Sequence, residues 1–212
     1  MTRSLKTMVA AGATALLLAA PSVALSATTF NGSFSVDGDA FDEPGLVVST
    51  APNGGGPIAP FSLEAGSSAS FLLFDIWTDE SSVNAGEDDV SQSIFVEFTF
   101  TDPVASGTLG GETLGNRIIG GLFQNGEVTW DAPLELSFGN GGLFTVALSD
   151  ETFNFGFLGL AGGEHRGASV EATVSLVSES VASVPLPASA LLLVSGLGGL
   201  GFAARRRRRA AA

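Results

Sequence analysis

The sequence predicts an all-β fold for the central part of the chain, an antiparallel β-sandwich of jelly-roll type. Residues 94–100 and 170–176 place apolar side chains at every second position, with mostly polar residues between them, which is the period of two that a half-buried strand requires. Clusters of Gly, Asn, Asp and Ser separate these and other short apolar runs. About ten short strands spaced in this way are typical of a sandwich, and a closed barrel is the alternative.

The expected strands follow one another from residue 29 onward. They cover residues 29–36, 71–77, 94–100, 127–130, 134–138, 143–148, 152–158 and 170–176. Gly-Asn-Gly-Gly at 139–142 predicts a hairpin connection, and Asn125-Gly126 predicts a turn before the strand at 127. Residues 49–60, rich in Pro and Gly, are expected to form a long surface loop, and the glycines of 107–121 to form hairpin turns.

The aromatic residues are mostly expected in the core. The chain has 16 Phe and no Tyr, and Phe153, Phe155 and Phe157 would share one face of a strand. Trp130 alternates with Val128 and is expected in the core. Trp77 ends its strand beside the acidic segment 78–89, so it is the candidate for an exposed platform on which a sugar stacks.

Charge and cysteine content limit what the protein can bind. The chain carries a formal net charge of −13, but its 22 acidic residues all lie between Asp37 and Glu179, where only Arg117 and Arg166 are basic. The central region is therefore strongly acidic, at −20, and lacks the basic surface that nucleic-acid binding requires. Anionic lipid is disfavoured for the same reason. The absence of Cys excludes disulfides and thiol chemistry.

The N-terminus has the parts of a secretory signal peptide, assigned to residues 1–27. Arg3 and Lys6 supply the positive charge, and residues 8–20 form the apolar run. Small residues then allow cleavage after Ala24 or Ala27. The chain is therefore expected to be exported, leaving one domain at residues 28–183.

The C-terminus combines three features in a fixed order. Val184-Pro185-Leu186-Pro187-Ala188 precedes an uncharged apolar run at 189–204, and Arg205, Arg206, Arg207, Arg208 and Arg209 follow it. A helix over the apolar run would extend about 24 Å, less than the ~30 Å hydrocarbon core of a bilayer. The arginines would stay on the cytoplasmic side and leave the acidic domain outside. A buried C-terminal helix is the alternative.

This tail, residues 184–209, resembles the VPLPA-CTERM sorting signal, a variant of the PEP-CTERM class. The resemblance implies recognition by an exosortase, a membrane-embedded protease that cuts near the motif and passes its substrate to the cell surface or the exopolysaccharide matrix. Val184 to Ala188 would then be substrate rather than catalyst. The sequence has Leu-Pro-Ala where Pro-Glu-Pro is usual, which implies an exosortase of matching preference.

Two acidic clusters are candidates for a calcium site. Asp37, Asp39, Asp42 and Glu43 surround Gly38 and offer the oxygen ligands that calcium takes, without the spacing of an EF-hand. The second cluster is 87–89, with Asp79 and Glu80 nearby. A solvated acidic loop is the alternative for both.

Catalysis has little support in the sequence. His165 is the only histidine, and no Gly-x-Ser-x-Gly motif accompanies it. A pair of carboxylates could hydrolyse glycosides, but with 22 acidic residues some such pair is inevitable. We therefore expect no enzyme, no catalytic residue and no cofactor besides calcium. The expected function is structural or adhesive, at the cell surface or in an exopolysaccharide matrix. The alternative is a calcium-assisted carbohydrate-binding module that uses Trp77.

Overall fold

The computed structural model describes residues 27–181, so both export signals, with the helices expected in them, lie essentially outside the described residues. The strands are β1 (Thr28–Asp37), β2 (Ser49–Ala51), β3 (Gly56–Leu63), β4 (Ser68–Trp77), β5 (Gln92–Asp102), β6 (Val104–Ile118), β7 (Phe123–Trp130), β8 (Leu134–Phe138), β9 (Gly142–Leu148), β10 (Glu151–Phe157) and β11 (Ala168–Ser178). Two short 3₁₀ helices, η1 (Asp39–Phe41) and η2 (Glu164–Arg166), lie in loops. No helix within the described range is long and apolar enough to cross a membrane.

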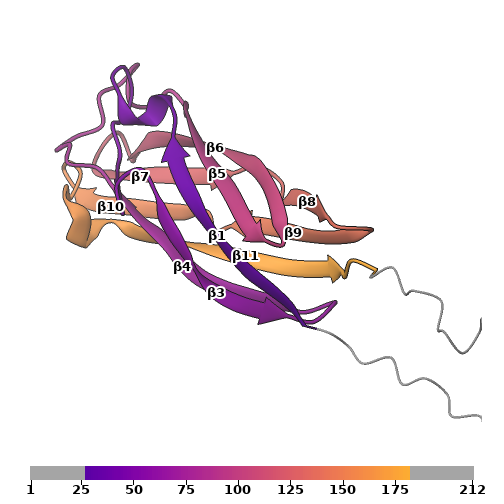
Figure 1. Cartoon of the computed structure of the whole chain (residues 1–212). Helices are drawn as coiled ribbons and strands as arrows, with labels where there is room; N and C mark the ends of the chain where they lie inside the picture. Colours follow the sequence, from indigo (N-terminus) through magenta and orange to yellow (C-terminus); the bar gives the residue numbers. More distant parts are fainter. Residues whose placement is uncertain (1–26, 182–212) are drawn as a thin grey trace, which may run out of the picture.

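The strands form two antiparallel sheets that pack face to face (Figure 1). The six-stranded sheet has the order β10-β7-β6-β5-β1-β3, and the five-stranded sheet has the order β2-β4-β11-β9-β8. The predicted β-sandwich is confirmed in this form. Both of the alternating segments that predicted it lie within their sheets, in β5 and β11.

The core lies between the sheets and is built by this alternation. In β5, Ile94, Val96 and Phe98 are fully buried, while the intervening Phe95 and Glu97 are exposed. Strand β11 repeats the pattern with Val170, Ala172, Val174 and Leu176 on the inner face. The burial of apolar surface at about 25 cal/mol per Å² supplies the main stabilisation of the domain, which has no disulfide.

Two segments predicted as loops or turns are strands. Of the glycine-rich segment 107–121, residues 107–118 belong to the 15-residue β6 and only 119–121 lie in a turn, while residues 49–60 contain β2 and the first part of β3. In β6 the glycines give room to neighbouring side chains. A Cβ at Gly107 would lie 2.8 Å from Leu136 of the opposite sheet, and one at Gly111 would lie 2.6 Å from the Trp130 ring. Trp130 itself is half-buried and packs against the core.

The predicted turn at Asn125-Gly126 is also wrong, because both residues lie inside β7. Gly126 faces the core, where its missing side chain leaves space for the Phe153 ring, which lies 2.2 Å from the position of a Cβ. The tight connection between β6 and β7 lies just before β7 instead, at residues 119–122.

Strand β10 does not keep its phenylalanines on one face. Phe153 is buried, but Phe155 and Phe157 are 56% and 64% exposed. A bulge interrupts the pairing of β10 with β7 between Phe153 and Gly156, and Asn154 within it has φ = 51°. An extra residue in a bulge moves the following side chains to the other face. The expectation that all three rings belong to the core is therefore corrected for two of them.

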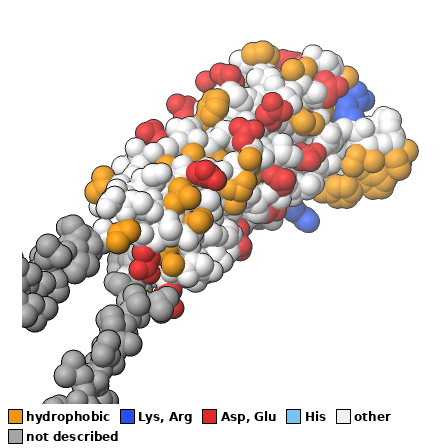
Figure 2. Space-filling model, turned by 90° about the vertical axis from the view of Figure 1, so that its right-hand side faces the viewer, with side chains coloured by type: hydrophobic (Ala, Val, Ile, Leu, Met, Phe, Trp, Pro, Cys, Tyr) orange, Lys and Arg blue, Asp and Glu red, His pale blue; other side chains and the backbone are white. Residues whose placement is uncertain are grey.

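The two ends of the sandwich differ in their connections. Thr28 pairs with Leu63, and the amide of Gly66 donates to the Leu176 carbonyl, so β1 begins and β11 ends at the same end, called here the proximal end (Figure 1). The longest connections, residues 38–48, 78–91 and 158–167, lie at the opposite, distal end. Acidic side chains are spread over the face shown in Figure 2.

Candidate functional site

The side chain singled out from the sequence, Trp77, is the last residue of β4, at the distal end of the five-stranded sheet. It pairs with Ser49 of the edge strand β2 and is half-buried. It lines a depression of about 490 Å³ together with residues of η1, β2 and the adjoining loops: Phe41, Val47, Val48, Ser49, Thr50 and Asn53. The depression therefore combines two aromatic rings with hydroxyl and amide groups.

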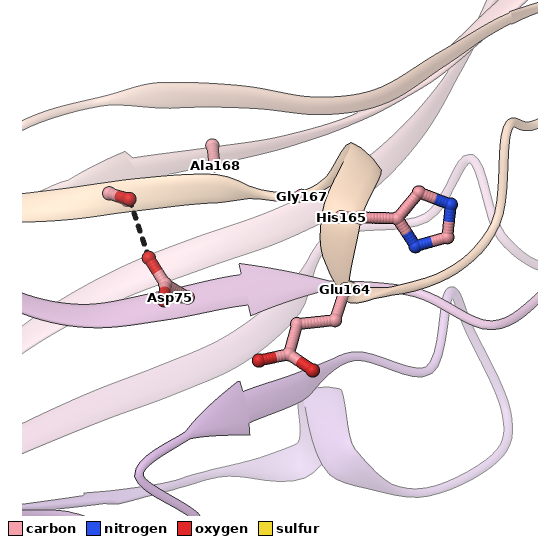
Figure 3. A pocket seen from close by; sticks show the side chains of 6 residues that line it. Asp75, Glu164, His165, Gly167 and Ala168 are labelled. Atoms are coloured by element: carbon pink, nitrogen blue, oxygen red, sulfur yellow. Dashed lines mark hydrogen bonds between the residues drawn. The ribbon is translucent and has the colours of Figure 1, made fainter.

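A second, more polar depression of about 390 Å³ lies between β4, β11 and η2 (Figure 3). Asp75, Glu164, His165 and Ser169 contribute its polar side chains. The Ser169 hydroxyl donates a hydrogen bond to Asp75 across the β4–β11 pair. The His165 imidazole points away from both carboxylates in Figure 3. The His165, Asp75 and Ser169 side chains therefore do not form the relay of a nucleophilic triad, in which the imidazole bonds to both partners.

The two depressions adjoin at Gly167. A Cβ at this position would lie 2.9 Å from the Trp77 Cβ and 2.4 Å from the Ile76 carbonyl oxygen. Glycine here lets η2 lie against the end of β4, so that the depression with two aromatic rings lies next to the one that carries carboxylates. A concave surface with aromatic groups and a few polar groups is a typical small-molecule or sugar site.

The first acidic cluster is not assembled into a metal site. Asp37 accepts a hydrogen bond from the Gly38 amide at 2.8 Å, and Asp39 accepts one from the Ser93 hydroxyl at 2.8 Å. Within residues 27–181, no group of three or more His, Asp or Glu side chains is placed to hold a metal ion. Calcium binding by Asp37, Asp39, Asp42 and Glu43 stays a prediction.

The second acidic cluster caps and joins the distal loops. Asp88 is buried and accepts a hydrogen bond from the Asn84 amide at 2.6 Å. Glu80 accepts one from the Val47 amide at 2.7 Å and so ties the 78–91 loop to the 38–48 loop. Burial raises the pKa of the Glu80 carboxyl above its ordinary value, the Val47 hydrogen bond opposes this, and the nearby carboxylates of Asp88 and Glu43 raise it further.

Sequence reasoning missed Asn154, which organises this end of the sandwich. Its side chain is fully buried, accepts a hydrogen bond from the Thr78 amide at 2.8 Å, and donates to the carbonyls of Ala161 and Gly163 at 2.6 and 3.0 Å. Asn tolerates the left-handed conformation that it adopts here. Its partners lie far from it in the sequence or in a glycine-rich loop, so no local pattern indicates the role. The sequence also did not indicate that Phe41 lines the same depression as Trp77, because the two residues are far apart in the chain.

Comparison with protein-family models, with curated proteins and with solved structures finds no match to this chain. The described residues form an acidic β-sandwich with a depression lined by Trp77 at its distal end. The sorting motif Val184 to Ala188 and the cluster Arg205 to Arg209 lie outside the described residues.

Proposed function

We propose that this chain is an exported protein of the cell surface or extracellular matrix, structural or adhesive in role, and processed by an exosortase at residues 184–188. The single observation that carries the proposal is the order of motif, short apolar run and arginines at residues 184–209. Before processing, the apolar run would hold the protein in the membrane as a single-pass anchor, transient if the tail is cut and permanent if it is not. The jelly-roll assignment within the sandwich class belongs to the same proposal.

The arrangement of the domain supports this proposal. Strand β11 ends at Ser178, a few residues before the motif, and does so at the proximal end. An attachment through the tail would therefore leave the distal loops and Trp77 facing away from the membrane. The charge of −20 in the central region, from 22 acidic residues and two arginines, favours solubility outside the cell.

Mass spectrometry of the mature surface protein tests the processing. We expect the C-terminal peptide to end near the motif and to lack Arg205 to Arg209. The matched control is a chain with Pro185→Ala and Pro187→Ala, which should keep its arginines. A wild-type protein that reaches the surface with the arginines still attached would rule out exosortase cleavage and leave an ordinary tail anchor.

The second candidate is a carbohydrate-binding module, favoured by the depression that Trp77 lines. An exopolysaccharide of the matrix would be the ligand class. We expect glycan-array binding by the wild type to be lost in Trp77→Ala and kept in Phe95→Ala, which removes an exposed ring from the other sheet. An array on which the wild type binds no glycan would count against this function.

Calcium assistance is tested separately. If Asp37, Asp39, Asp42 and Glu43 close around calcium, millimolar calcium raises the melting temperature of the wild type, because a ligand that binds only the folded state stabilises it. The variant with Asp37→Asn and Asp39→Asn should lose that increase. An unchanged wild-type melting temperature would remove calcium from the proposal and leave the sugar site standing.

A further inference from the structure

A group of large apolar side chains is exposed at the distal end of the six-stranded sheet. Its members come from the connection between β6 and β7 and from the end of β10. We name them, together with the half-buried Phe123, the apolar tip: Ile118, Ile119, Leu122, Phe123, Phe155, Phe157 and Leu158. Ile119 and Leu158, the most exposed, are 73% and 70% accessible. Figure 2 shows hydrophobic side chains gathered at the end of the molecule away from the grey termini, with a basic side chain beside them.

The apolar tip is an ordered surface. The Phe123 ring stacks on Phe155 with 5.6 Å between centroids and meets Phe157 at 5.5 Å. The Leu158 amide donates a 2.8 Å hydrogen bond to the Leu122 carbonyl, which joins the end of β10 to the β6–β7 connection. The exposed rings are therefore held in place before any partner arrives, which lowers the entropy cost of binding.

The area of the apolar tip suits a protein interface. At about 200 Å² for a fully exposed side chain of this size, its exposed fractions amount to roughly 700 Å². The largest apolar patch on a typical monomer is about 300–600 Å². A stable protein–protein interface buries about 800 Å² on each partner. The apolar tip is thus larger than the largest apolar patch of a typical monomer and approaches the area that each partner of a stable interface buries.

Charge selects which partner fits. Residues 113–126 and 152–163, which carry the apolar tip, contain no acidic residue and include Arg117, whereas all 22 acidic residues lie elsewhere in residues 37–179. The carboxylates that border these two segments include that of Glu127, which accepts a hydrogen bond from Asn116, and those of the neighbouring loop at residues 79–89. Two copies of this chain would repel each other through almost any other pair of surfaces. That repulsion is weakest where the side chains in contact carry no carboxylate, as in the apolar tip.

We propose that the apolar tip binds the apolar tip of a second copy of this chain, about a two-fold axis. Such an interface is self-complementary, because the same patch serves both partners. The contact is made by side chains rather than by strand addition, since the segment after β10 folds back on this strand: the Ala161 amide donates to the Asn154 carbonyl at 3.0 Å. The pair does not depend on export or on processing of the tail.

The geometry of such a pair would allow it to link two molecules. Contact between two distal ends leaves the two proximal ends, where each chain continues, on opposite sides of the pair. A dimer of this kind would link two separately attached molecules while leaving their tails free.

Cysteine cross-linking of the full chain tests the proposal, because the chain has no cysteine of its own. Ile119→Cys and Leu158→Cys, each alone and mixed, would be treated with a short bis-maleimide reagent and separated on a denaturing gel. We expect covalent dimers from the apolar tip. The matched control is Val104→Cys, a position that is 80% exposed but lies beside Thr101 at the proximal end, and it should stay monomeric.

A second variant keeps the result falsifiable. Phe155→Ser with Phe157→Ser, added to Ile119→Cys, replaces exposed rings and should abolish the dimer while leaving the circular dichroism spectrum unchanged. Raising the salt concentration should strengthen cross-linking of the parent variant, because salt screens the repulsion between acidic domains. The proposal is overturned by dimers that form equally through Val104→Cys, by dimers that survive the serine substitutions, or by apolar-tip cysteines that give no dimer. Protection of those cysteines from the reagent without dimers would indicate a different occupant, such as lipid.

Discussion

Two groups of phenylalanines in this domain pack alike but differ in burial. In the proximal half, Phe144 meets Phe30 at 5.1 Å and Phe100 at 5.0 Å, and all three rings are buried. At the distal end, Phe123 meets Phe155 at 5.6 Å and Phe157 at 5.5 Å, and both partner rings are mostly exposed. Only the first group removes its rings from water by folding, so only the first group stabilises the monomer to the full extent of its apolar area.

The difference divides the sandwich into a stabilising half and a contact half. The proximal half has short turns and an aromatic core, and both chain ends leave from it. The distal end holds the long loops, the Trp77 and His165 depressions and the apolar tip. Loops on a rigid scaffold are where binding residues usually lie. We therefore expect substitutions in the two halves to change different properties.

The largest expected loss of stability comes from a substitution in the buried group of phenylalanines. Phe144→Ala should lower the free energy of unfolding by about 3–5 kcal/mol, because it removes a fully buried ring and leaves a cavity. Denaturant unfolding at low protein concentration measures it. Phe157→Ala is the matched control, since it deletes the same side chain from an exposed position, and should cost less than about 1 kcal/mol. Similar losses from the two variants would contradict the division into two halves.

The next largest loss of stability is expected from the hydrogen bonds that hold the distal loops together. Asn154→Ala should cost about 1–3 kcal/mol, because it removes three hydrogen bonds and leaves the buried Thr78 amide without its partner. Thermal melting measures the change, and the melting temperature should fall. The fall should be smaller than that of Phe144→Ala.

Asn154→Gly separates the two contributions of this residue. Glycine relieves the backbone at φ = 51° but supplies no side-chain hydrogen bond. If the hydrogen bonds dominate, Asn154→Gly is nearly as unstable as Asn154→Ala. If glycine restores the wild-type melting temperature, the role of Asn154 is conformational only, and the network that joins Thr78 to Ala161 is not stabilising.

Much of the fold could be predicted from local patterns, and the glycines of β6 and β7 were misinterpreted for one physical reason. Strands β5 and β11 follow from alternation alone, and the turn at 139–141 follows from its glycines. Strand β6 was missed because its glycines serve close packing, as Gly107 does beneath Leu136, rather than chain reversal. A sequence shows that a residue is small but not which distant side chain needs the space.

The functional surfaces were less accessible to prediction. Trp77 could be selected because an aromatic residue at a strand end beside an acidic segment is a local feature. The exposure of Phe155 and Phe157 could not be, because it depends on a bulge at Asn154 whose hydrogen-bonding partners lie in other loops. Before the bulge is known, alternation places both rings in the core. The apolar tip is thus a product of tertiary structure.

The smallest expected effect is a pH dependence of stability that arises from Glu80 at the distal end. Burial and the carboxylates of Asp88 and Glu43 raise the pKa of Glu80 in the folded state. An acid with a raised pKa is more easily protonated when folded, so its full contribution to stability is present below the pKa of the unfolded chain. That contribution is lost as the pH rises through the raised value. Above that value, the ionised Glu80 gives the folded domain less stability than the protonated side chain does.

Glu80→Gln should raise the melting temperature at pH 7, because the amide keeps an oxygen that can accept the Val47 hydrogen bond and carries no charge. The gain should shrink as the pH is lowered toward the ordinary range of a glutamate, where the wild-type side chain is also neutral. Glu97→Gln removes one charge from an exposed position on β5 and corrects for the general effect of reducing a net charge of −20. A gain for Glu80→Gln that equals that of Glu97→Gln at every pH would show that the distal end bears no more electrostatic strain than the rest of the surface.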